Sequence, residues 1–62
     1  MNAYKVFIQS GNDLLVRIVE SEQDFEKAVA ELTQNDTKFI ARQTNGKKIL
    51  LKTKNIIMVE EA

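Results

Sequence analysis

The two glycines of this 62-residue chain constrain its fold more than any other feature. Each stands beside an asparagine, as Gly11-Asn12 and Asn45-Gly46, inside a segment rich in β-branched and other apolar residues. Two-residue hairpin turns of the primed types need positive φ at one or both central residues, which glycine and asparagine tolerate best. We therefore predict two β-hairpins, each with its turn at one of these pairs.

Between the two hairpins lies a segment with the pattern of an amphipathic helix. Ser21 suits the N-cap, and Asp24 three residues later approximates a capping box. Apolar residues then recur at i, i+3, i+4 and i+7, which places them on one helical stripe. The stripe consists of Phe25, Ala28, Val29 and Leu32. We expect the helix to end at Asn35-Asp36.

The remaining segments complete an α+β domain. An irregular step at Lys54-Asn55 precedes a last strand, so the order is β-β-α-β-β-β in one domain, residues 1–62. Strands are predicted at residues 3–10, 13–20, 37–44, 47–53 and 56–60. We expect a small antiparallel sheet of five strands with the one helix packed on it. The sheet is either a meander with the helix across it or a partly rolled barrel.

The absence of cysteine and histidine limits both the chemistry and the stability of the chain. Disulfides, thiol catalysis, histidine-based catalysis and the usual transition-metal ligands all lack their side chains. We expect no enzyme activity, no metal and no cofactor. A chain of this length buries only about 60% of its unfolded surface, so small domains of this kind often rely on association.

Turn position sets strand register, and register sets the faces of each hairpin. With Ser10 opposite Asp13, one face of the first hairpin carries Tyr4, Val6, Ile8, Leu15 and Val19, and the other carries Phe7, Leu14, Val16 and Ile18. With Thr44 opposite Lys47, Ile40 lies opposite Leu51 in the second hairpin. Arg42 and Ile49 share that face, and Phe39, Ala41 and Leu50 lie on the other.

Both hairpins are thus apolar on both sides, whereas one helix covers one face. Either the sheet curls around its second apolar face, or that face meets another chain, and we favour a homodimer. The predicted partner-binding residues are Ile40 and Leu51, or Phe39 and Leu50 if the helix takes the opposite face.

Charge is distributed unevenly along a chain whose net charge is zero. Residues 1–36 hold seven acids and three bases, and residues 37–62 hold six bases and two acids. The stretch 38–54 contains no acid and forms a candidate nucleic-acid-binding hairpin, with a solvated or edge-protecting set of lysines as the alternative. Its cations are Lys38, Arg42, Lys47, Lys48, Lys52 and Lys54.

The segment from Thr44 to Ile49 resembles the equivalent turn of a small bacterial flagellar protein family, over about a third of the chain once the following strand is included. That likeness consists of hairpin residues and implies no function. In size and in its lack of catalytic residues the chain is similar to accessory proteins of phages and mobile elements, which bind host machinery.

We therefore predict a non-enzymatic protein-binding module, a homodimeric regulator or inhibitor of a protein partner that is not yet identified. Nucleic-acid binding through the basic hairpin is the alternative. The chain has no apolar run long enough to span a membrane and opens without a signal-peptide pattern, so we expect a cytoplasmic protein.

Overall fold

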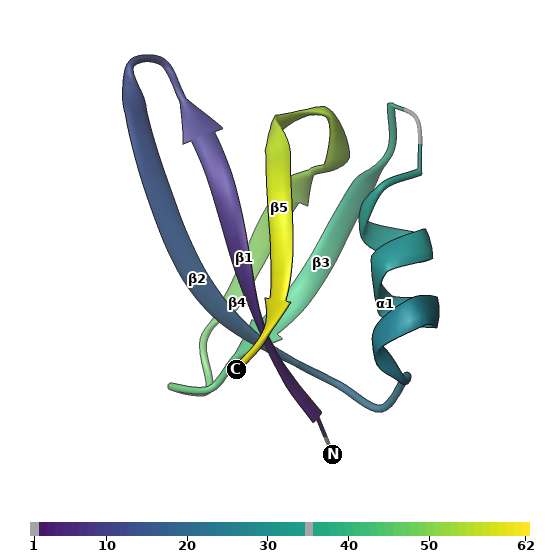
Figure 1. Ribbon diagram of the computed structural model, residues 1–62. Coiled ribbons are helices and arrows are strands. Elements are labelled where there is room, and N and C mark those ends of the chain that lie inside the picture. The colour runs from purple at the N-terminus through teal and green to yellow at the C-terminus, as the bar shows by residue number, and fades with distance from the viewer. Residues whose placement is uncertain (1, 35) are drawn as a thin grey trace.

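A five-stranded antiparallel sheet forms the framework of the protein, and one helix packs on it (Figure 1). The computed structural model describes residues 2–34 and 36–62. The spatial order is β4-β3-β2-β1-β5. The predicted fold class and element order are confirmed. The elements are β1 (Asn2–Ser10), β2 (Asp13–Ser21), α1 (Phe25–Leu32), β3 (Lys38–Gln43), β4 (Lys48–Lys52), the 3-10 turn η1 (Thr53–Asn55) and β5 (Ile56–Glu61).

The sheet folds over on itself without closing. Within the described residues β2 pairs with β3 only at Val19↔Gln43 and Glu20↔Arg42, so the two hairpins diverge from this junction. Figure 1 shows the β3–β4 hairpin behind β1 and β5, with α1 beside β3. The outermost strands, β4 and β5, are joined by η1 and remain the two edges of the sheet.

The first hairpin has the predicted turn. Ser10 lies opposite Asp13, and Gly11 has φ of 60°, as the first central position of a type II′ turn requires. This register places Tyr4 opposite Val19 and Val6 opposite Arg17. The faces predicted for this hairpin are therefore confirmed.

The predicted register of the second hairpin is wrong by one residue. Its loop contains three residues rather than two, because the Gln43 amide donates to the Lys47 carbonyl and the Gly46 amide donates to the Gln43 carbonyl, both at 2.9 Å. Gly46 takes φ of 87°, as in a three-residue loop with a left-handed third residue. Ile40 consequently lies opposite Leu50, not Leu51.

Asp24, and not Ser21, caps the helix. The Asp24 carboxylate accepts a hydrogen bond from the Lys27 amide at 2.9 Å, and Ser21 is the last residue of β2. The Ser21 hydroxyl accepts from the Gln23 amide at 3.0 Å, which shapes the turn before the helix. The helix ends earlier than expected, at Leu32, with Thr33 as its C-cap. Of the predicted end, Asn35 lies outside the described residues.

The core is built from the helical stripe and from the inner faces of both hairpins. Ala28 and Leu32 are buried, and the Phe25 ring packs 5.8 Å from the Tyr4 ring, centroid to centroid. Because side chains of both hairpins join one cluster, the curl of the sheet encloses its inner face. The buried apolar residues of the described chain are Tyr4, Val6, Val19, Ala28, Leu32, Ala41 and Leu51.

Hydrogen bonds between Thr37 and Thr53 connect the start and the end of the β3–β4 hairpin. The buried Thr53 hydroxyl accepts from the Thr37 amide and donates to the Thr37 carbonyl, each at 3.1 Å. The Thr53 amide donates to the same carbonyl at 3.0 Å. The irregular step expected near Lys54-Asn55 is therefore an ordered 3-10 turn that holds β4 in place as β5 begins.

Candidate binding surfaces

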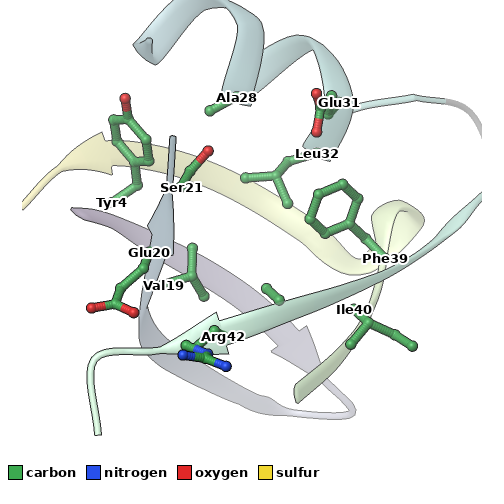
Figure 2. A pocket seen from close by; sticks show the side chains of 11 residues that line it. Tyr4, Val19, Glu20, Ser21, Ala28, Glu31, Leu32, Phe39, Ile40 and Arg42 are labelled. Carbon is green, nitrogen blue, oxygen red and sulfur yellow. The ribbon is translucent and has the colours of Figure 1, made fainter. Parts of the chain in front are cut away.

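The four residues predicted for partner binding are divided between two faces. Phe39 and Leu51 lie opposite each other on the inner face, where Leu51 is 2% exposed. Ile40 and Leu50 lie opposite each other on the outer face, 70% and 56% exposed. In Figure 2 Phe39 points from β3 toward α1, whereas Ile40 lies on the other side of the strand. Pairing Ile40 with Leu51 was wrong because a shift of one residue reverses every side chain of a strand.

The outer face of the second hairpin gathers four of the six predicted cations. Its cross-strand pairs are Lys38↔Lys52, Ile40↔Leu50 and Arg42↔Lys48, so one apolar pair lies between two like-charged pairs. We call these six residues the β3–β4 outer face. The other two cations, Lys47 in the turn and Lys54 in η1, are exposed at its ends.

Acidic residues border this face at two places. Glu20 of β2 lies opposite Arg42 on the side away from β4. Asp36 and Lys54 line a shallow hollow together with Lys38 and Lys52. These acids lie at the margins of the face. Within the face, Lys38 lies opposite Lys52, and Arg42 lies opposite Lys48. Like charges placed directly opposite destabilise a sheet.

A second outer surface lies on β5, β1 and β2, and it is apolar. At its centre, Phe7 lies opposite Val16 on β2 and opposite Met58 on β5. Lys5, on the same face, lies opposite Ile18 and Glu60. We call this surface the β1 outer face. Its exposed apolar members are Leu14, Val16, Ile18 and Met58, with exposed fractions between 37% and 56%.

This surface was not among the predicted sites, although part of its signal is present in the sequence. Leu14, Val16 and Ile18 alternate along one strand, and the register predicted from the turn places them with Phe7 on one face of the first hairpin. The contribution of Met58 depends on the pairing of the last strand with the first, which local patterns do not reveal.

A shallow groove of about 200 Å³ lies between α1 and β3 (Figure 2). Its floor consists of core side chains, among them Ala28, Leu32 and Phe39. Glu31 and Arg42 are among its polar lining residues, and they stand at the edge next to solvent. The groove offers apolar contact rather than paired groups for acid–base chemistry.

Two further observations apply to residues 2–34 and 36–62. In this part of the chain no three acidic, histidine or cysteine side chains lie close enough to hold a metal ion. The helix within the same residues is too short and too polar to cross a membrane.

No protein-family model, curated protein or solved structure matches this chain. The likeness of the Thr44–Ile49 turn to a flagellar family is therefore not extended to the rest of the sequence.

Proposed function

We propose that this protein is a non-enzymatic binding module of the cytoplasm that forms a homodimer and regulates or inhibits a protein partner. The observation that carries the proposal is the β1 outer face, an apolar strip across three neighbouring strands. Such a mode of action is the one used by accessory proteins of phages and mobile elements. The β3–β4 outer face remains free for the partner in this arrangement.

Size and chemistry both favour a second copy as the occupant of the β1 outer face. The core contains few large side chains, and a domain of this length gains stability when association adds apolar burial. A two-fold axis brings a surface against itself, so the surface must be self-complementary. This one is apolar at the centre and carries a cation, Lys5, and two anions, Glu20 and Glu60, on the same face.

The dimer is tested with two matched variants. Met58 and Leu50 are both outer-face residues of edge strands, and they are 46% and 56% exposed. Met58→Glu places a charge in the proposed dimer surface, whereas Leu50→Glu places the same charge outside it. In sedimentation equilibrium we expect dimers for the parent and for Leu50→Glu, and a 7.1 kDa monomer for Met58→Glu. A monomeric parent, or dissociation by Leu50→Glu alone, contradicts the proposal.

Nucleic-acid binding is the second candidate, and the gathering of Lys38, Arg42, Lys48 and Lys52 on one face favours it. Binding led by phosphate contacts weakens steeply with salt, with a slope close to the number of contacts. A filter-binding titration of single-stranded and duplex DNA at several salt concentrations tests this candidate. No binding, or binding that is independent of salt, excludes it.

A further inference from the structure

The β3–β4 outer face combines four cations with an exposed apolar pair, and this composition restricts the kind of partner that can bind it. We propose that it binds an acidic, extended segment of another protein in which an apolar side chain stands between carboxylates. This proposal deepens the function proposed above, because it gives the chemistry of the regulated partner. It uses a surface separate from the one proposed for the dimer.

The cations on this face exceed what edge protection explains. Lysines on an edge strand discourage sheet-to-sheet aggregation, which accounts for Lys48 and Lys52 on β4. Within the described part of the chain, strand β3 pairs with β2 only at Arg42 and Gln43, so Lys38 has no strand partner on that side. Arg42, in contrast, has strand partners on both sides, and it still faces Lys48. Each pair of facing cations costs stability in the free protein, and an anionic partner relieves that repulsion.

The apolar pair between the cations selects the kind of anion. Ile40 and Leu50 are highly exposed, so covering them removes apolar surface from water. A sugar-phosphate backbone satisfies the cations but provides no apolar surface for this pair, and the face has no aromatic side chain on which a base stacks. A protein segment with an apolar residue satisfies both parts of the surface.

The spacing of the face specifies the sequence pattern of that segment. Along a strand, residues two apart lie about 7 Å from each other on the same side, and residues four apart about 13 Å. Ile40 is two residues from both Lys38 and Arg42. An extended segment with an acid, an apolar residue and a second acid at alternate positions therefore aligns each acid with a cation pair and the apolar residue with Ile40 and Leu50.

The test uses a capped peptide of alternating glutamate and threonine with one central leucine. Two controls accompany it, the same peptide with serine in place of leucine and a thymidine oligonucleotide of equal charge. Each is titrated into the ¹⁵N-labelled protein, and amide shifts are followed by NMR. We expect the leucine peptide to shift amides of β3 and β4 and to bind about tenfold more tightly than the serine peptide.

Variants identify the contribution of each part of the face. Ile40→Ser should remove the preference for leucine while leaving weak, salt-sensitive binding of both peptides. Lys38→Gln should weaken both peptides together. Ile57→Ser replaces an exposed apolar residue outside this face and should change neither affinity. These side chains are exposed, so the variants keep the fold.

Several outcomes overturn the proposal. Tighter binding of the oligonucleotide than of the leucine peptide assigns the face to nucleic acid. Equal affinities of the two peptides, shifts outside β3 and β4, or no shifts with any probe also contradict it. Repeating the titration with Met58→Glu separates the two proposals, because the peptide surface stays intact whether or not the protein dimerises.

Discussion

The two outer faces are made by one sheet and differ in what they can bind. The β1 outer face has an apolar centre with one cation, Lys5, and two anions, Glu20 and Glu60, beside it, whereas the β3–β4 outer face has an apolar centre between four cations. A two-fold axis through the second face would set cations against cations, which is unfavourable, but the first face has no such conflict. The charges beside an apolar patch therefore decide whether it suits a second copy or a different, acidic partner.

The largest effect on the free energy of unfolding is expected from substitutions of two neighbouring leucines. They test which residues of β4 point into the core and which point to the outer face. Leu51 is buried and Leu50 is exposed. Leu51→Ala should lower the free energy of unfolding by about 2–4 kcal/mol, because it removes core contacts and leaves a cavity. Leu50→Ala should change it by less than about 0.5 kcal/mol. Urea unfolding of both variants measures the difference, and equal losses would show that the register of β4 is wrong.

The next effect is a dependence of the melting temperature on protein concentration. It is expected if the protein folds and dimerises in one step through the β1 outer face. When dimers unfold to monomers, the melting temperature rises with protein concentration. We expect this dependence for the parent and for Ile40→Ser, and its absence for Val16→Lys. Differential scanning calorimetry at several concentrations provides the measurement. A melt of the parent that is independent of concentration would contradict a dimer coupled to folding.

The helix cap offers a change in stability that involves neither outer face. Asp24→Ala should cost about 1 kcal/mol, because the Lys27 amide loses its acceptor. The loss should exceed that of Ser21→Ala, whose hydroxyl accepts only within the preceding turn. Thermal unfolding compares the two variants. Peptide binding by the folded Asp24→Ala protein should remain unchanged, and a loss of affinity would show that the β3–β4 outer face depends on the helix.

The smallest expected effect on the free energy of unfolding is a stabilisation. Lys52→Glu replaces a like-charged pair with an attractive one opposite Lys38, so it should stabilise the free protein by about 0.2–1 kcal/mol at low salt. The gain should shrink at high salt, since these side chains are exposed and screened. Lys54→Glu, which is in no strand pair, is the control. A destabilised Lys52→Glu protein would mean that the facing cations do not repel each other significantly.

Local chemistry was sufficient to predict the order of elements but not the faces of the second hairpin. Glycine and asparagine mark both turns, and the stripe from Phe25 to Leu32 marks the helix. Asn45-Gly46, however, is compatible with loops of two or three residues, and a difference of one residue exchanges Leu50 with Leu51 as the exposed side chain. Turn residues alone therefore left the outer surface undetermined.

The helix cap and the β1 outer face could not be predicted from the sequence alone. Ser21 and Asp24 both carry acceptors suitable for a helix cap, and the chain uses the one directly before Phe25. The β1 outer face requires β5 to pair with β1, which joins the two ends of the chain. Such non-local pairing brings Met58 beside Phe7, and no local periodicity indicates it.

The central claim is that the β1 outer face forms the dimer and that the β3–β4 outer face binds the acidic segment. One NMR experiment tests this claim most directly. Spectra of the ¹⁵N-labelled protein are recorded over a dilution series and then during addition of the leucine peptide. Dilution is expected to shift amides of β1, β2 and β5, and the peptide is expected to shift amides of β3 and β4. Dilution shifts confined to β3 and β4, or peptide shifts centred on Phe7 and Met58, would contradict the assignment of the two faces.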